Sequence, residues 1–260
     1  MFIKIISILS SLTLLSRVLG YLRDLLIAKV IGAGLISDCF FIAFKLPNLF
    51  RRLFAEGSMN SAFIPVVSGV REKVGKIEAD QFFSKIFSIL IIFLFFFVIL
   101  LEIFAPLVIS LIAPGFSEDS LKKELTVDFA RLTFPFLLFI CATSLIGAYL
   151  NTLGKFASMA LTPVILNLTI ITCLVIFFKN TDQTFITYYL SLSISIAGII
   201  QLVWMLYNLK RNKVSLSVFG LNKNKFRKPT NKFLKLLVPA ILGNGVYQLN
   251  LLIDMILTST

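Results

Sequence analysis

Histidine is absent from this chain of 260 residues, and its absence excludes several kinds of site at once. Zinc sites built on imidazole, Ser-His-Asp triads and histidine proton relays all need the missing side chain. Cysteine is nearly as scarce, because Cys39, Cys141 and Cys173 each stand inside an apolar run without CxxC spacing. We interpret the three as small buried hydrophobes. The sequence therefore predicts neither a metal site nor a disulfide, and we expect no cofactor.

Charge is the second scarcity, since charged residues make up 15% of the chain and hydrophobic residues 58%, with a mean hydropathy of +0.94. A soluble domain needs a larger polar share, so this balance predicts a membrane protein. The net charge of +12 could suggest nucleic-acid binding, but the basic residues lie mostly in short loops between apolar runs. Membrane topology and anionic lipid explain that placement, so we expect membrane lipid as a partner and no nucleic acid.

Long apolar runs dominate what is present. A helix needs about 20 apolar residues to span the hydrocarbon core, and seven such stretches run approximately over 5–30, 36–56, 86–112, 129–150, 160–178, 184–208 and 234–258. No small-residue cleavage site follows the first, so we interpret it as a retained helix. Residues 57–70 are too short and mixed to span, and we expect them at the membrane interface. The predicted fold class is an all-α polytopic membrane helical bundle.

The connecting loops predict the orientation of this bundle. The segment 209–235 carries nine Lys or Arg residues and no acid, which is typical of a cytoplasmic loop. Counting back through the spans places 69–85 and the turn at Lys155 on the same side, and it places 113–128, which has four acids, on the outside. The amino terminus is therefore predicted to be cytoplasmic.

Charges inside the first two spans are the most specific feature of the sequence. An Arg, Lys or Asp at a helix centre costs roughly 2.5–3.5 kcal/mol on insertion scales. Arg17, Arg23 and Lys45 cannot all reach an interface from opposed helices, so a shared aqueous cavity is the cheaper arrangement. The charged residues of the two spans are Arg17, Arg23, Asp24, Lys29, Asp38, Lys45, Arg51, Arg52 and Glu56.

Helical spacing gathers these charges onto faces, because residues seven apart return to nearly the same side. Ser16 lies over Arg23 and Arg17 over Asp24. On the second span, Asp38, Lys45 and Arg52 form one stripe. Each helix is thus predicted to have one polar face and one lipid face.

Neutralisation within a helix requires a partner three or four residues away. Arg52 has Glu56 at that spacing, whereas Arg17, Arg23 and Arg51 have no acid there. One interpretation is that acids of the neighbouring helix or free carbonyls hold these arginines.

The alternative is that they grip a phosphate or pyrophosphate, whose oxygens suit the planar guanidinium fork. Asn48, beside Pro47, could donate to the same anion where the kink loosens the backbone. We interpret the hydroxyl of Ser16 as a packing or supporting group.

Uncharged polar residues in the later spans are more often interhelical contacts than substrate contacts. The acid Asp254 in the last span is treated separately, because an intramembrane acid can couple transport to a proton or cation. The uncharged polar residues of the later spans are Asn167, Gln201, Asn244, Gln248 and Asn250.

The arginine-bearing region also carries a family resemblance. The run SRVLGYLRDLLIAKVIGAG, followed by SDCFFIAFKLPNLFRRLFAEGSMNSAFIPV, resembles the MurJ (MviN) lipid II flippase family of the multidrug/oligosaccharidyl-lipid/polysaccharide (MOP) exporter superfamily. Later stretches, GAYLNTLGKF with TPVILN and LVPAILGNGVYQLNLLID, are similar to the same family. Family members have fourteen helices in two lobes. The resemblance therefore implies a six-helix amino-terminal lobe over 1–208, a basic cytoplasmic linker over 209–235 and a truncated seventh helix over 236–260.

The resemblance also implies a function. Its family moves lipid II, the undecaprenyl-pyrophosphate-linked peptidoglycan precursor, across the bacterial inner membrane by alternating access. Arg23 and Arg51 fall on arginines of the family's central cavity, and the charged positions Arg17, Asp24, Asp38 and Glu56 also match. The expected partners are lipid II and the carboxyl-terminal lobe of the same protein, which this chain lacks.

Three competing functions are weighed against the charges. A drug exporter of the same superfamily needs cavity acids for cationic cargo, whereas excess Arg and Lys favours an anion. A flippase for another polyprenyl-linked glycan stays open. A membrane enzyme acting on lipid pyrophosphates normally needs clustered acids for Mg²⁺ or a histidine nucleophile, and the sequence has no DxD or DDxxD motif. We therefore expect a transporter rather than an enzyme.

Overall fold

The computed structural model of the protein describes residues 2–51, 58–117, 119–216 and 226–259, and it is helical throughout these ranges apart from short connections. The helices are α1 (Phe2–Val30), α2 (Leu35–Arg51), α3 (Ser58–Val74), α4 (Lys76–Ile103), α5 (Ala105–Ile112), the 3-10 helix η2 (Pro114–Ser117), α6 (Ser120–Thr133), α7 (Pro135–Thr152), α8 (Ala157–Ala160), α9 (Thr162–Ile176), α10 (Gln183–Arg211) and α11 (Arg227–Ser259). The predicted all-α bundle is confirmed.

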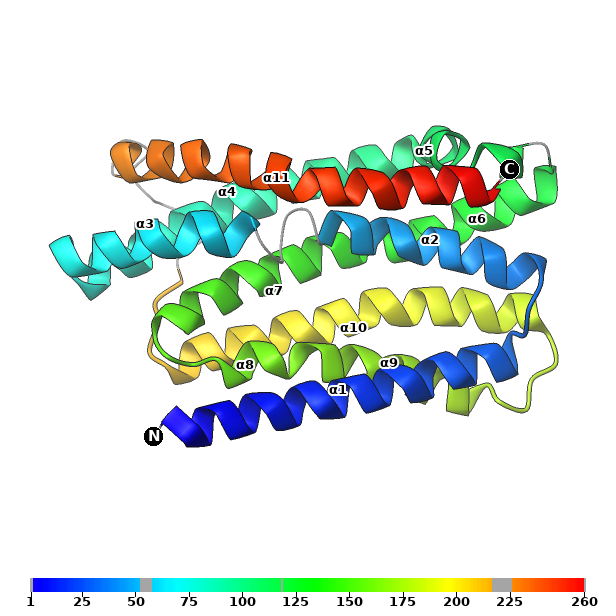
Figure 1. Cartoon of the computed structure of the whole chain (residues 1–260), viewed down its shortest axis with the longest axis horizontal. Coiled ribbons are helices and arrows are strands. Elements are labelled where there is room, and N and C mark those ends of the chain that lie inside the picture. The colour runs from blue at the N-terminus through cyan, green and yellow to red at the C-terminus, as the bar shows by residue number, and fades with distance from the viewer. Residues whose placement is uncertain (1, 52–57, 118, 217–225, 260) are drawn as a thin grey trace.

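The helices lie roughly along one long axis, with α1 at one edge and α11 at the opposite edge (Figure 1). Helix α10 occupies the centre, where it packs on α7, α9 and α6. Helix α11 packs on α3, and α1 packs on α9 and α8. Among the described residues, four helical stretches are long and apolar enough to cross a membrane, namely Lys76–Ile103, Ser120–Thr152, Ala157–Ile176 and Gln183–Arg211. This pattern is that of a membrane protein.

Helices cover all seven predicted spans as far as the structure describes them, but their ends differ from the prediction. Helix α4 begins at Lys76, ahead of the predicted 86–112 span, and α11 begins at Arg227, inside the predicted linker 209–235. The reason is that hydropathy locates the apolar centre of a span, whereas backbone hydrogen bonding continues through polar residues outside it.

The interfacial placement of 57–70 stays a prediction, and its described part is a helix packed in the bundle. Residues from Ser58 onward form α3, which packs on α4, α7 and α11. In Figure 1, α3 and α2 follow one another along the long axis. One face of α3, including Met59, Phe63 and Val67, is buried. Ser61, Glu72 and Lys73 lie on the exposed side of the helix, and its buried face joins the segment to the bundle.

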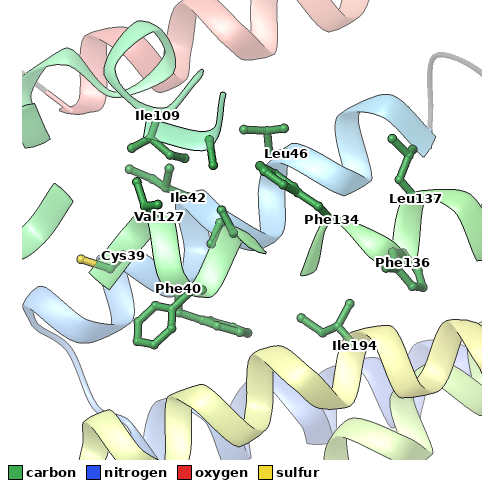
Figure 2. Packing of buried hydrophobic residues seen from close by; sticks show 14 of the residues in the cluster. Cys39, Phe40, Ile42, Leu46, Ile109, Val127, Phe134, Phe136, Leu137 and Ile194 are labelled. Atoms are coloured by element: carbon green, nitrogen blue, oxygen red, sulfur yellow. The ribbon is translucent and has the colours of Figure 1, made fainter. Parts of the chain in front are cut away.

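Apolar side chains from α2, α5, α6 and α10 fill one end of the interior. Figure 2 shows Ile42 and Leu46 near Val127, Phe134 and Ile109. The three cysteines are free and buried, as the sequence predicts. Because lipid is as apolar as these side chains, close packing rather than expulsion from water holds such helices together.

A close helix approach occurs where α10 crosses α7. A Cβ built on Gly198 would lie 2.9 Å from Phe136 Cδ2 and 3.0 Å from Phe139 Cβ. Real Cβ atoms almost never come this close to a neighbour, so a side chain at this position would push the two helices apart. A glycine at this crossing thus sets the distance between α7 and α10.

A polar pair joins α4 to α7 inside the bundle. The hydroxyl of Tyr149, which is fully buried, donates a hydrogen bond to Oδ1 of Asp80, which is 6% exposed. The ring of Tyr149 stacks on Phe83 with centroids 4.4 Å apart. The Asp80 carboxyl is therefore held away from solvent by a donor from another helix.

Tyr149→Phe is expected to lower the free energy of unfolding by about 1–3 kcal/mol, because the ring still packs while the buried Asp80 carboxyl loses its donor. Thermal unfolding of the purified protein in detergent measures the loss. Tyr207→Phe is the matched control, since Tyr207 is 56% exposed. Equal midpoints for the two variants would contradict a stabilising role for the buried bond.

Candidate functional site

The guanidinium of Arg23 is anchored between α1 and α9. Its Nε and Nη2 donate to Oδ1 of Asp24 at 2.9 Å and 2.7 Å, and its Nη1 donates to Oδ1 of Asn167 at 3.0 Å. The amide of Asn167 in turn donates to the main-chain carbonyl of Ser16 at 3.0 Å. One asparagine on α9 therefore ties together two positions of α1 and fixes the direction of the arginine.

This geometry corrects the expectation that Arg23 has no acid on its own helix. The rule of three or four residues concerns side chains on the same face, but the long Arg23 side chain bends sideways to the adjacent Asp24. The arginine side chain is 19% exposed and that of Asp24 is 63% exposed. An ion pair with so exposed a partner contributes little stability.

The remaining described charges of α1 and α2 are exposed. Arg17 on α1 and Asp38 and Lys45 on α2 all face outward, and no ion pair involves any of them within the described ranges. The opposite side of α2, with Phe40 and Leu46, is buried in the core. The stripe predicted for α2 is exposed as far as Lys45, but the lipid face predicted opposite it is wrong, because that side packs in the core.

Convergence of these charges in one cavity stays a prediction. The principal packing partners of α1 are α8 and α9, whereas those of α2 are α6, α7 and α10. Arg52 and Glu56 lie outside the described residues, and the side chains of Arg51 and Asp254 lie outside the described part of their helices. Of the predicted site, the structure thus brings together Ser16, Arg23 and Asp24.

Asn48 and Pro47 are accommodated by local hydrogen bonds in α2 and from α6. The Asn48 amide donates to the carbonyl of Phe44 at 3.1 Å, so one of its hydrogens is engaged within α2. Pro47 cannot donate to the Ala43 carbonyl, and the hydroxyl of Thr133 on α6 donates to it instead at 3.1 Å, sharing its one hydrogen with the Ala130 carbonyl at 3.0 Å. A neighbouring helix thus repairs the backbone break that the proline makes.

Two of the uncharged polar candidates are confirmed as interhelical contacts. Asn167 links α9 to α1, and Gln201 Nε2 on α10 donates to the carbonyl of Thr162 at 2.7 Å. The side chains of Asn244, Gln248 and Asn250 lie outside the described residues. The sequence reasoning missed Asp80 and its Tyr149 partner. A signal existed, because Asp80, Ser84 and Ser88 recur at a spacing of four and thus share one face of α4.

Long apolar helices, polar interhelical contacts and outward-facing cations on two of the helices define a polytopic membrane protein with a basic amino-terminal region. Comparison with known proteins gives the family. The chain belongs to the lipid II flippase MurJ family, whose model matches residues 27–260.

Individual relatives agree with this assignment. The chain is 38% identical over 253 residues to the probable lipid II flippase MurJ of Rickettsia prowazekii (strain Madrid E), covering 97% of this chain and 48% of that protein. It is 37% identical over 250 residues to the protein of the same name from Rhizobium tropici, covering 95% of this chain and 46% of that protein. The chain thus spans about half the length of the curated relatives it matches.

A solved structure also matches. It is described as lipid II flippase MurJ in an inward closed conformation, with a TM-score of 0.77 and 31% sequence identity, over 96% of this chain and 50% of that one. The family resemblance predicted from the arginine-bearing region is therefore confirmed at the level of sequence and of fold.

Proposed function

We propose that this chain forms the amino-terminal half of a transporter that moves lipid II from the cytoplasmic to the periplasmic leaflet of the bacterial inner membrane by alternating access. Residues 1–208 form one lobe, 209–235 a basic cytoplasmic linker and 236–260 the seventh helix, and the amino terminus is cytoplasmic. A carboxyl-terminal lobe completes the transporter. Membership of the flippase family supports this assignment.

The observation that carries the proposal is the presentation of Arg23. A guanidinium has five N–H donors, and three of the hydrogen bonds that Arg23 makes go to Asp24 and Asn167. The fork is thereby held in one direction while donors remain for a further acceptor. Because the Asp24 partner is largely exposed, a pyrophosphate with more negative charge can displace it at small cost.

Each predicted site residue has a role in this proposal. Arg17, Arg23 and Arg51 hold the pyrophosphate, and Asp254 couples transport to an ion. The groups that support the cavity or act as gates are Ser16, Asp24, Asp38, Lys45, Asn48, Arg52 and Glu56. The excess of cations over acids on the exposed faces favours an anionic cargo over a cationic drug.

Proteoliposomes containing the full-length protein provide the test. Fluorescent lipid II in the outer leaflet is expected to become inaccessible to a membrane-impermeant quencher, relative to protein-free vesicles. A polyprenyl-pyrophosphate carrying an unrelated glycan should move at least tenfold more slowly. Equal rates for the two lipids would favour the broader alternative, a flippase for other polyprenyl-linked glycans, and movement of neither would refute flippase activity.

A further inference from the structure

A cavity of about 460 Å³ lies between the amino-terminal end of α1 and the ends of α7 and α10. Its lining includes Leu9 and Leu12 from α1, Lys155 after α7, and Trp204 and Arg211 from α10. None of the residues proposed to hold lipid II lines it. The lining contains two cations and no carboxylate, so the electrostatic character of the cavity is positive.

Helix caps fix both cations in place. Gly154 has φ +73°, its N–H donates to the Asn151 carbonyl at 3.0 Å, and the N–H of Lys155 donates to the Leu150 carbonyl at 3.0 Å. These two bonds form a Schellman motif that ends α7 and sets the direction of the chain at Lys155. Arg211 stands in the last turn of α10. The two charges therefore project from well-defined backbone positions.

Arg211 is not needed to cap its own helix. The N–H of Lys213, at φ +53°, donates to the Lys210 carbonyl at 3.0 Å, and the N–H of Val214 donates to the Leu209 carbonyl at 3.1 Å. The Asn208 carbonyl accepts from Asn212. Backbone and amide donors thus satisfy the terminal carbonyls. The guanidinium of Arg211 stays available to a ligand, and no ion pair occupies it in the part of the chain that the structure describes.

A hydrogen-bonded network makes the floor of the cavity rigid. The indole N–H of Trp204 donates to the Ser158 carbonyl at 3.0 Å, and the Ser158 hydroxyl donates to Oδ1 of Asn208 at 2.9 Å. The Trp204 ring also stacks with that of Tyr207, at a centroid distance of 6.1 Å. Trp and Tyr are enriched where the hydrocarbon of a bilayer meets its headgroups. The pair therefore favours a position of the cavity near the headgroups.

The remaining wall is apolar and lies at the edge of the bundle. Helix α1, which supplies Ile8, Leu9 and Leu12 to the cavity, packs mainly on α9 and α8 and forms the border of the molecule in Figure 1. A ligand in this position meets cations at one end and apolar side chains along its length. That combination matches a phosphate attached to acyl chains.

We propose that this cavity binds an anionic glycerophospholipid of the cytoplasmic leaflet, with Lys155 and Arg211 contacting its phosphate and α1 contacting its acyl chains. The proposal shares the orientation proposed above, in which the loop at Lys155 and the end of α10 are cytoplasmic. Anionic lipids are enriched on that face, where each Lys or Arg near the surface favours their binding. The bound lipid would join α1 to the centre of the bundle through α10.

The test measures how much lipid the full-length protein retains. Native mass spectrometry monitors the bound lipid while phosphatidylglycerol or phosphatidylcholine is titrated. The double variant Lys155→Gln/Arg211→Gln is expected to bind phosphatidylglycerol about thirtyfold more weakly, at about fivefold for each cation removed. The control Lys73→Gln/Lys210→Gln removes the same charge from exposed positions outside the cavity. Its binding should change less than threefold. Equal weakening in the two double variants would overturn the proposal in favour of diffuse surface charge.

A second variant keeps both cations and fills the cavity. Leu12→Trp is expected to reduce phosphatidylglycerol retention as the double variant does, and unaltered retention would overturn the proposal. Inorganic phosphate and farnesyl pyrophosphate test whether the cavity instead binds a free phosphate ion or the pyrophosphate of the transported lipid. Displacement of the lipid by phosphate alone at equal concentration would show a free-anion site. Loss of farnesyl pyrophosphate binding in the double variant would assign the cavity to the transported lipid, and each of these two results would overturn the assignment to a glycerophospholipid.

Discussion

Arg23→Ala in the full-length protein is expected to abolish growth of a bacterial strain that depends on it for cell-wall synthesis, while membrane insertion stays normal. The physical reason is the loss of the oriented guanidinium that we propose contacts the pyrophosphate. Arg23→Lys should restore little growth, because lysine keeps the charge but cannot bond two oxygens in one plane. Plating efficiency, with immunoblotting of the membrane fraction, measures both parts.

Two controls separate substrate contact from packing. Asn167→Ala removes the hydrogen bond at 3.0 Å that orients Arg23 but keeps the arginine, so growth should be reduced less than with Arg23→Ala. Arg131→Ala removes an exposed arginine of α6 and should grow normally. Normal growth of Arg23→Ala would refute the role in anion binding. Equal defects for Arg23→Ala and Asn167→Ala would instead indicate that the α1 to α9 contact is what matters.

Gly198→Ala is expected to cause the largest loss of stability, about 1–3 kcal/mol or more, because the new methyl group would lie 2.9 Å from Phe136 and 3.0 Å from Phe139. Both neighbours are aromatic residues held between helices, and one of the contacts is at a Cβ that cannot move without its backbone. The yield of monodisperse protein in detergent and its thermal unfolding midpoint measure the effect.

Two other glycines provide matched comparisons. At Gly147 the closest neighbour is Sδ of Met159, at 2.6 Å, and a flexible methionine can rotate away, so Gly147→Ala should cost less than Gly198→Ala. At Gly69 no atom lies within 4 Å of the added Cβ, so Gly69→Ala should be neutral or slightly stabilising through its better helix propensity. Similar midpoints for all three variants would contradict control of the α7 to α10 distance by Gly198.

Hydropathy and local motifs predicted the positions of the helices well and their ends poorly. The apolar centre of α10 matches the predicted span 184–208, because 3.6-residue periodicity and long apolar runs are local properties. The ends of α4 and α11 escaped prediction because their polar first turns contribute nothing to an apolar window. The packing of α3 in the bundle was not predicted, because its apolar run is short and only one of its faces is buried.

The candidate site was predicted in composition but not in geometry. Arg23 stood out because a charge inside an apolar span is costly, and this cost can be read from the sequence. Its pairing with Asp24 depends on the rotamer of a long side chain, and its contact with Asn167 joins positions 144 residues apart. Neither property follows from spacing along one helix.

The contact between Thr133 and the Ala43 carbonyl couples position 133 on α6 to position 47 on α2. Proline at 47 is tolerable because the Thr133 hydroxyl donates to the carbonyl that the missing amide would have bonded, so the effects of changing the two residues are coupled. If the proline were replaced, the new amide could donate to the Ala43 carbonyl, and the Thr133 hydroxyl would no longer be needed there. Trimming the threonine to alanine would instead uncover an orphan carbonyl deep in the molecule.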